Sequence, residues 1–230
     1  TIQRNAERIL QLVNQLMDIR KIDKGQMSLM FKKAEIVSFT RDLLETFEQQ
    51  TRVKKLDLKF HTSAPEIEMW IDPKNFDKII LNLLSNACKF TPENGQVEIS
   101  LSTGEDTHLP QNAPLRRYVE LTVADSGIGI ASTEREHIFE RFYQIRNSQN
   151  NSNIGTGIGL HLTRSLVELH YGNIHVEDNG EGRPGSRFII RLPLGNGHLK
   201  KEEIEEATTA DTLINIPAAE PATIAPPLPY

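Results

Sequence analysis

One aspartate and two glycines follow the point where a strand pattern stops. Residues 118–123 alternate apolar and polar side chains, which predicts a half-buried β-strand. Asp125 comes next, followed by Gly127 and Gly129 at intervals of two residues. Glycine lets the backbone lie close to a flat ligand, while the carboxylate accepts hydrogen bonds from that ligand. The segment therefore predicts one wall of a nucleotide pocket.

A second glycine cluster opens a predicted helix. Gly155, Gly157 and Gly159, with Thr156 between the first two, precede apolar residues at helical spacing that begin with Leu160. The first N–H groups of a helix have no partner within the helix and carry partial positive charge. This cluster therefore predicts a cradle for a phosphate group.

Three polar residues share one face of a long predicted helix, which starts after Asp72 and ends near Phe90. Asn82, Asn86 and Lys89 are spaced by four and three residues, so they lie along one side. Amide oxygens are suitable ligands for Mg²⁺, and a lysine one turn further can reach a phosphate. Either asparagine alone would be interpreted as a surface or capping residue, but beside the glycine clusters the set predicts a metal and phosphate site.

The remaining elements must position these groups. Further strands are predicted at 27–32, 56–61, 68–71, 97–101, 174–176 and 187–192, and further helices at 36–54 and 133–142. Residues 102–117 are predicted to form a surface loop. Residues 143–154 are rich in Asn and Ser without periodicity, which predicts a mobile lid.

The first residues predict a separate helix with two apolar stripes. Its first stripe steps by four and three residues, as in a helical bundle, and a second stripe widens it. We expect this helix to pack against a partner that is not evident in the chain; the alternative is a helix folded onto the main domain. Gly25 predicts its end. Because the chain begins inside this pattern, we expect it to be a piece of a longer protein.

Composition narrows the function classes. The formal charge of −5 argues against nucleic acid as a general partner, because phosphate backbones are bound through surplus Lys and Arg. The single cysteine, Cys88, cannot form a disulfide within the chain, which fits a reducing cytosol. No apolar run reaches the roughly 20 residues needed to span a bilayer.

Four ordered motifs resemble those of sensor histidine kinases. Residues 82–91 resemble the N box, 125–129 the first glycine box, 139–142 the phenylalanine box and 155–160 the second glycine box. Residues 185–188 resemble the family's last glycine turn, so the resemblance covers residues 1–194. It implies an α+β fold, the two-layer α/β sandwich of the Bergerat type, with a mixed sheet, helices on one face and one long helix before it.

The resemblance also implies a domain organisation. Residues 1–25 would be the second helix of the dimerisation and phosphoacceptor hairpin, and residues 26–194 the ATP-binding catalytic domain. Residues 195–230 would be a linker or tail, whose start resembles the junction to a receiver domain in hybrid sensors.

Roles for single residues follow from the same resemblance. Asp125 would accept a hydrogen bond from the adenine amine, Asn86 would bind Mg²⁺, Lys89 would pair with phosphate oxygens, and Asn82 would hold a water or orient the site. Gln144 stands where many members carry a lid arginine. Either Arg146 or Arg141 would supply the missing charge, or the contact with phosphate would be weaker. The other expected nucleotide contacts are Gly127, Gly129, Phe142, Gly155, Thr156, Gly157, Gly159 and Leu160.

The expected function is therefore transfer of the ATP γ-phosphoryl group to a histidine, for relay to an aspartate of a response-regulator receiver domain. The parent protein would be a homodimer, and this chain the cytoplasmic portion of a membrane-anchored bacterial sensor. The family's phosphoacceptor motif is missing from the sequence, since the earliest histidine, His61, falls in a predicted strand. We expect the chain to bind ATP without phosphorylating itself at the usual site.

Two other interpretations stay open. A degenerate kinase could act as a nucleotide-gated interaction module, although the intact Asn86, Lys89, Asp125 and lid glycines argue against this. Other ATPases of the same fold carry a catalytic glutamate where Asn82 stands, and they lack the N-terminal helix.

Overall fold

The computed structural model describes residues 2–145, 156–180 and 182–205. Within these ranges the strands are β1 (Lys32–Glu35), β2 (Asp57–Thr62), β3 (Glu68–Ile71), β4 (Gln96–Glu105), β5 (Arg117–Asp125), β6 (Asn173–Asp178) and β7 (Ser186–Pro193). The α-helices are α1 (Ile2–Asp23), α2 (Ile36–Glu45), α3 (Glu48–Lys54), α4 (Pro73–Phe90) and α5 (Gly159–Leu169). Short 3₁₀ turns span Pro114–Arg116, Ser132–Glu134, His137–Phe139 and Lys201–Glu203.

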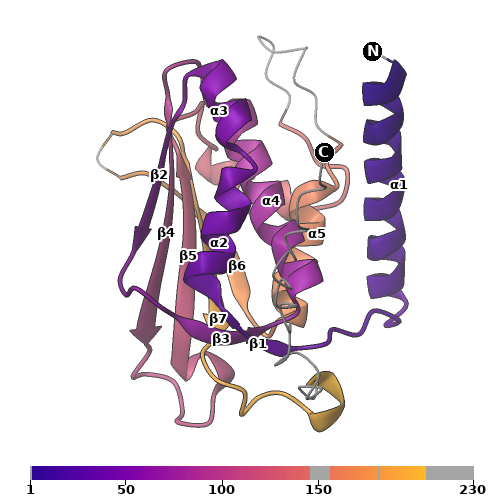
Figure 1. The fold of residues 1–230 in the computed structure, drawn as a ribbon, viewed down its shortest axis with the longest axis vertical. Helices are drawn as coiled ribbons and strands as arrows, with labels where there is room; N and C mark the ends of the chain where they lie inside the picture. Colours follow the sequence, from indigo (N-terminus) through magenta and orange to yellow (C-terminus); the bar gives the residue numbers. More distant parts are fainter. Residues whose placement is uncertain (1, 146–155, 181, 206–230) are drawn as a thin grey trace, which may run out of the picture.

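These elements form two layers. A five-stranded sheet in the order β2-β4-β5-β7-β6 makes one layer, with β2 parallel to β4 and the other neighbours antiparallel. Helices α2 to α5 cover one face of that sheet (Figure 1). Strands β1 and β3 form a separate antiparallel pair. The predicted α+β sandwich with a mixed sheet and helices on one face is confirmed.

The core lies between the sheet and the helices. Alternate residues of β4 are buried because successive side chains of a strand point to opposite faces. On α4 the buried residues recur at helical spacing, which gives that helix one apolar face. Burying one such side chain contributes roughly 1.5–3 kcal/mol. The buried core residues include Val97, Ile99 and Leu101 of β4 and Phe76, Ile80, Leu83 and Leu84 of α4.

Helix α4 begins and ends as predicted. Asp72 caps its N-terminus by accepting a hydrogen bond from the N–H of Asn75 at 3.1 Å, and Pro73 is the first helical residue. The second carboxylate oxygen of Asp72 accepts from the N–H of Met30 at 2.9 Å. One side chain thus joins the helix that carries the candidate site residues to the segment that follows α1.

Several predicted boundaries were wrong. The strand predicted at 27–32 begins later, as β1. No strand forms at 27–30, because the Met30 N–H bonds to the Asp72 side chain. Phe31 makes only an isolated bridge to Ile204. The predicted helix 36–54 is two helices, and it breaks where the hydroxyl and N–H of Thr46 both bond the Leu43 carbonyl. Strands β4 and β5 extend into the predicted loop 102–117.

The predicted helix 133–142 was also wrong. In its place are two 3₁₀ turns, each closed by a bond between residues three apart, such as the Glu140 N–H to the His137 carbonyl at 2.8 Å. Phe142 ends the segment with a φ of +61°, which a helix cannot include.

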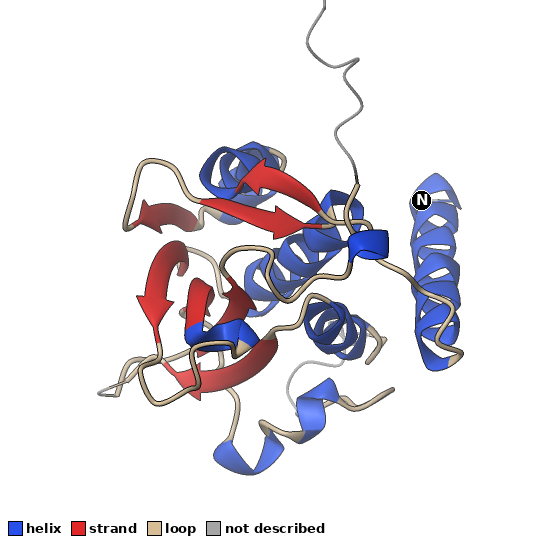
Figure 2. Cartoon of the chain, turned by 90° about the horizontal axis from the view of Figure 1, so that it is seen from below, coloured by secondary structure: helices blue, strands red, loops and turns tan. Residues whose placement is uncertain are grey.

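Helix α1 lies on the far side of the helical layer, alongside α5 (Figures 1 and 2). Gly25 ends it at a φ of +63°, and the N–H groups of Gly25 and Gln26 bond carbonyls of its last turn. Its C-terminal half packs on the domain, since Ile19 is buried and Asp18 pairs with Lys78 of α4 at 2.7 Å. Five large apolar side chains of the described part of α1 are exposed, namely Ile9, Leu10, Val13, Leu16 and Met17.

Residues beyond β7 return to the segment after α1. The Phe31 N–H donates to the Glu203 carbonyl at 2.6 Å, and the Glu205 N–H donates to the Phe31 carbonyl at 2.8 Å. The hydroxyl of Tyr171, just after α5, donates to the Glu203 carboxylate at 2.8 Å. A 3₁₀ turn occupies Lys201–Glu203. None of the helices within the described ranges is long and apolar enough to cross a membrane.

We expect acid to weaken the fold through His170. This ring is buried between Phe31 and Phe76, its Nδ1 bonds the Leu166 carbonyl at 2.7 Å, and its Nε2 accepts from the Asp72 N–H at 3.2 Å. Burial lowers the pKa of His170, so the folded state holds the neutral ring while the unfolded chain takes up a proton. The free energy of unfolding therefore has its full value, as far as His170 is concerned, above about pH 6.5 and falls below that pH. Urea unfolding between pH 7.5 and 5 measures this decrease.

Two variants separate this effect from other titrations. His170→Phe should remove that part of the pH slope and cost about 1–3 kcal/mol at pH 7.5, because the Asp72 N–H loses its acceptor. His108→Asn, in an exposed turn, should change neither the pH slope nor the free energy of unfolding at pH 7.5. An unaltered slope in His170→Phe would show that other groups cause the acid response.

Candidate functional site

Asp125 is the last residue of β5, and its carboxyl group is enclosed. The residue is 7% exposed, and its Oδ1 accepts a hydrogen bond from the Gly127 N–H at 2.8 Å. Burial raises the pKa of Asp125 to about 6, while the N–H groups of Gly127 and Ser186 oppose that shift. Near neutral pH the group is therefore a buried carboxylate that gains from an additional hydrogen-bond donor, such as an amine on a ligand.

The loop after Asp125 depends on close backbone contacts. A methyl group at Gly127 would lie 2.7 Å from the Phe90 carbonyl oxygen, and one at Gly185 would lie 1.7 Å from the Asp125 carbonyl oxygen. Gly129 has a φ of +74° and also lies against Gly185. These glycines bring the loop onto the end of α4 on one side and onto the β6–β7 turn on the other.

Sequence reasoning missed Asn179. Its Nδ2 donates to the Asp125 carbonyl at 2.6 Å and to the Pro184 carbonyl at 2.8 Å, so one amide holds the β6–β7 turn against the end of β5. The sequence signal was an asparagine beside Gly180 in a turn, which is typical of many turns. Its partner lies 54 residues away, so spacing alone could not identify it.

The polar face of α4 connects the two glycine clusters. Nδ2 of Asn82 donates to the Gly159 carbonyl at 2.7 Å and to the Thr163 hydroxyl at 3.1 Å, both in the first turns of α5. Phe90, two turns further along the same face, contacts Gly127. Asn86 lies between them on that face and is half-buried. The first glycine cluster therefore meets the C-terminal end of α4, and the second meets its middle.

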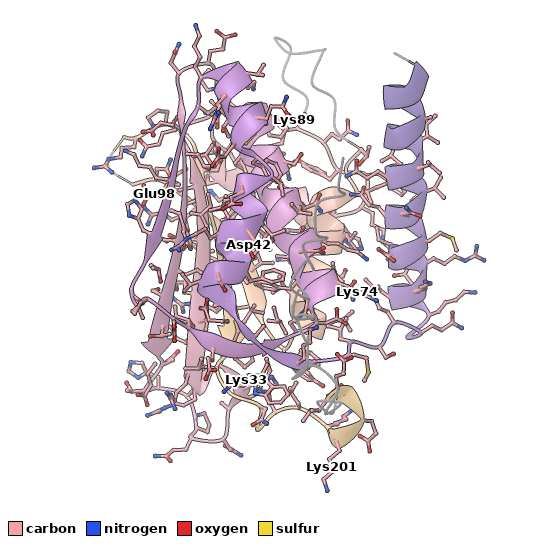
Figure 3. All side chains as sticks on the ribbon, in the orientation of Figure 1. Lys33, Asp42, Lys74, Lys89, Glu98 and Lys201 are labelled. Carbon is pink, nitrogen blue, oxygen red and sulfur yellow. The ribbon has the colours of Figure 1, made fainter. Side chains whose placement is uncertain are left out.

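Lys89 lies at the C-terminal end of α4, and Lys74 lies at the opposite end (Figure 3). The Lys89 ammonium is 4.6 Å from the centre of the Phe90 ring. Lys89 is one residue before Phe90, whose carbonyl contacts Gly127, so the backbone of Lys89 lies close to the loop that carries Asp125.

The second glycine cluster is described from Thr156 onward. Gly157 has a φ of +69°, and its carbonyl accepts from the Phe142 N–H at 2.9 Å, which joins the phenylalanine box to this cluster. Gly159 is the first residue of α5, and Leu160 packs partly into the core. Gly155 and Arg146, with most of the predicted lid, lie outside the described residues.

A cavity of about 280 Å³ lies beside this cluster, between α1 and Phe142. Phe142 is 65% exposed, so its side chain is not part of the core. The Arg141 side chain connects α1 with α5. It pairs with Asp23 of α1, and its Nε donates to Nε2 of His161 in α5 at 2.9 Å. The cavity is lined by Leu16, Ile19, Arg20, Asp23, Arg141, Phe142 and Ile158.

The described residues hold no group of three or more His, Cys, Asp or Glu side chains that could bind a metal ion. A cation at this site would need amide oxygens, such as that of Asn86, together with oxygens of its ligand. The half-buried asparagine face of α4 fits a hard cation that brings its own phosphate ligands.

Comparisons with known proteins agree with this geometry. Residues 71–196 match the family described as histidine kinase-, DNA gyrase B- and HSP90-like ATPases. The chain is 38% identical over 193 residues to the sensor histidine kinase TmoS of Ectopseudomonas mendocina, covering 84% of this chain and 18% of TmoS. It is 33% identical over 213 residues to the hybrid signal transduction histidine kinase D of Dictyostelium discoideum, covering 91% of this chain and 13% of that protein.

A solved structure shares the fold. Full-length ShkA in complex with AMPPNP superposes with a TM-score of 0.68 at 26% identity, covering 84% of this chain and 37% of ShkA. The chain spans less than a fifth of the length of the two relatives above. The matched region contains α4, Asp125 and the described part of the second glycine cluster, and the chain belongs to the family of histidine kinase-, DNA gyrase B- and HSP90-like ATPases.

Proposed function

We propose that this chain is the ATP-binding catalytic module of a two-component sensor histidine kinase. The observation that carries the proposal is the face of α4, where Asn86 lies between a buried carboxylate loop at Phe90 and the start of α5 at Asn82. Adenine would donate its exocyclic amine to Asp125. The phosphates would extend along this face toward the N-terminus of α5, where N–H groups without helical partners favour negative charge.

Asn86 would ligate Mg²⁺, and Lys89 would pair with phosphate oxygens. The cation supplies neutralisation of charge on the phosphates when it is bound. In phosphoryl transfer the protein acts mainly by positioning and by electrostatic stabilisation, so side chains without a nucleophile are sufficient. Asn82 would act by positioning, because its amide donates to the Gly159 carbonyl and holds the first turn of α5 on α4.

Asp125 would also select the base. Guanine presents a carbonyl acceptor where adenine presents an amine donor, so two acceptors would face each other in a buried site. Leaving such a group unpaired costs roughly 1–3 kcal/mol.

The proposed acceptor is a histidine on the first helix of the hairpin to which α1 would contribute the second helix, in the same or the partner subunit. The exposed apolar stripe of α1 fits that role, because a helical bundle would bury Ile9, Leu10 and Val13. A receiver domain of a response regulator would take the phosphoryl group next, which accords with the relative named as a hybrid kinase. The module would work on the cytoplasmic side, where ATP is supplied.

Calorimetric titration with a non-hydrolysable ATP analogue, with and without Mg²⁺, tests the proposal. We expect binding that strengthens with Mg²⁺, and Asn86→Ala should lose about tenfold or more of that gain because an amide ligand is removed. As a control, Ser85→Ala changes the exposed residue that precedes Asn86 on α4, and this variant should bind as the wild type does. A wild-type chain that binds no nucleotide would exclude the kinase proposal and favour an interaction module.

A second measurement tests the transfer itself. The chain, mixed with ATP labelled in the γ-phosphate and with a separately supplied hairpin that carries the phosphoacceptor histidine, should label that hairpin. The chain alone should gain no stable phosphohistidine. If the chain binds nucleotide but labels no hairpin, the proposed ATP site would stand and the proposed kinase activity would be rejected.

A further inference from the structure

Lys54 ends helix α3 and reaches the end of α4. Its ammonium group donates to the carbonyls of Cys88 at 2.8 Å, Lys89 at 3.0 Å and Thr91 at 2.9 Å. An ammonium has three N–H donors, and here all three are used on the backbone of one short segment. This side chain lies 34 residues or more from its acceptors along the chain, so no sequence pattern indicates it.

The acceptors are groups that a helix end leaves without partners. The last carbonyls of an α-helix lack helical donors and carry partial negative charge. At α4 the N–H and hydroxyl of Thr91 satisfy the Ala87 carbonyl, while Lys54 satisfies carbonyls on both sides of Phe90. Lys54 is therefore an external cap, supplied by another helix, for the end of the helix that carries Asn86 and Lys89.

The carboxylate loop packs on the same segment. Gly127 contacts the Phe90 carbonyl and donates its N–H to Asp125. Ser126 is tied nearby, since its hydroxyl accepts from the Gln96 N–H at 2.8 Å and its own N–H donates to the Gln96 carbonyl at 2.9 Å. The backbone at 88–91 thus supports both halves of the candidate site, the phosphate side through Lys89 and the base side through Gly127.

We propose that Lys54 is a positioning residue for the nucleotide site, which sets the place of Lys89 and of the Asp125 loop without contacting the nucleotide. This inference rests on the proposed ATP-binding function. A lysine that served stability alone would change the melting temperature and leave the affinity of the folded protein unaltered. A positioning lysine changes affinity under conditions where the protein is fully folded.

The test measures the dissociation constant for a non-hydrolysable ATP analogue with Mg²⁺, well below the melting temperature of each variant. Lys54→Met should weaken binding about tenfold, because small displacements of binding groups have effects of this size or larger. Lys54→Arg keeps donors for the same carbonyls and should stay within about threefold of the wild type. Lys55→Met removes the same charge from the exposed neighbouring side chain and should bind as the wild type does.

Hydrogen exchange supplies a readout without nucleotide. In Lys54→Met the amides of Thr91 and Gly127 should exchange faster, while those of β6 should not change. If Lys54→Met does not fold, Lys54→Gln, which retains two donors, should show an intermediate loss of affinity. A folded Lys54→Met or Lys54→Gln protein with wild-type affinity would overturn the inference alone, whereas a wild-type chain that binds no nucleotide would overturn the proposed function and the inference with it.

Discussion

Asp125→Asn should abolish most nucleotide binding while leaving the fold intact. The substitution replaces a charged acceptor with an amide, and hydrogen bonds to charged groups contribute about 1.5–3 kcal/mol, so the affinity for an ATP analogue should fall about 10–150-fold at pH 7.5. Stability should not fall, because burial raises the pKa of Asp125 to about 6 and the ionised form is therefore unfavourable in the folded state. Calorimetric titration and thermal unfolding of the same sample measure the two effects.

The stability of the fold and the affinity for nucleotide should change in opposite directions as Asp125 ionises. Because the folded pKa of Asp125 lies above that of the unfolded chain, its ionisation destabilises the fold as the pH rises through 6. Nucleotide binding needs the ionised form, so wild-type affinity should fall roughly tenfold per pH unit below about 6. The Asp125→Asn variant should lack this dependence.

A matched control is Asp42→Asn, which removes an exposed carboxylate on α2 (Figure 3). It should change neither affinity nor its pH dependence. Equal losses of affinity in both variants would mean that net charge, and not the buried acceptor, governs binding.

Among glycine-to-alanine substitutions in the β6–β7 turn, Gly185→Ala should destabilise the protein most. Gly185 has a φ of +106°, and the new Cβ would lie 1.7 Å from the Asp125 carbonyl oxygen, so the backbone must move. A left-handed conformation costs an alanine roughly 1–2 kcal/mol, and overpacking adds about 1–3 kcal/mol. We expect the free energy of unfolding to fall by about 3 kcal/mol or more, measured by urea denaturation, with loss of nucleotide affinity as the Asp125 loop shifts.

Gly180→Ala separates these two causes. Gly180 lies in the same turn at a φ of +75°, but a methyl group there meets no atom within 4 Å. Its cost should be only the conformational part, roughly 1–2 kcal/mol, with affinity unchanged. Similar losses in the two variants would show that backbone conformation alone explains the effect at Gly185.

Local patterns predicted the elements that carry the site. The alternation in 118–123 and the cap at Asp72 depend on residues close together in sequence, and β5 and α4 form as those patterns indicate. The helix after Gly159 was predicted for the same reason. Prediction failed where side chains compete with the regular backbone pattern, as Thr46 does between α2 and α3 and Asp72 does at Met30.

The sequence by itself predicted the residues that are proposed to carry the chemistry, because residue type and spacing are local properties. They are Asn82, Asn86, Lys89, Asp125 and the glycines of the two clusters. Only the tertiary structure decided what holds them together. Asn179 and Lys54 bond partners 54 and at least 34 residues away, and His170 bonds Asp72 across 98 residues. Such contacts form when packing brings distant backbone groups together, and a buried N–H or carbonyl then takes whichever partner the fold places beside it.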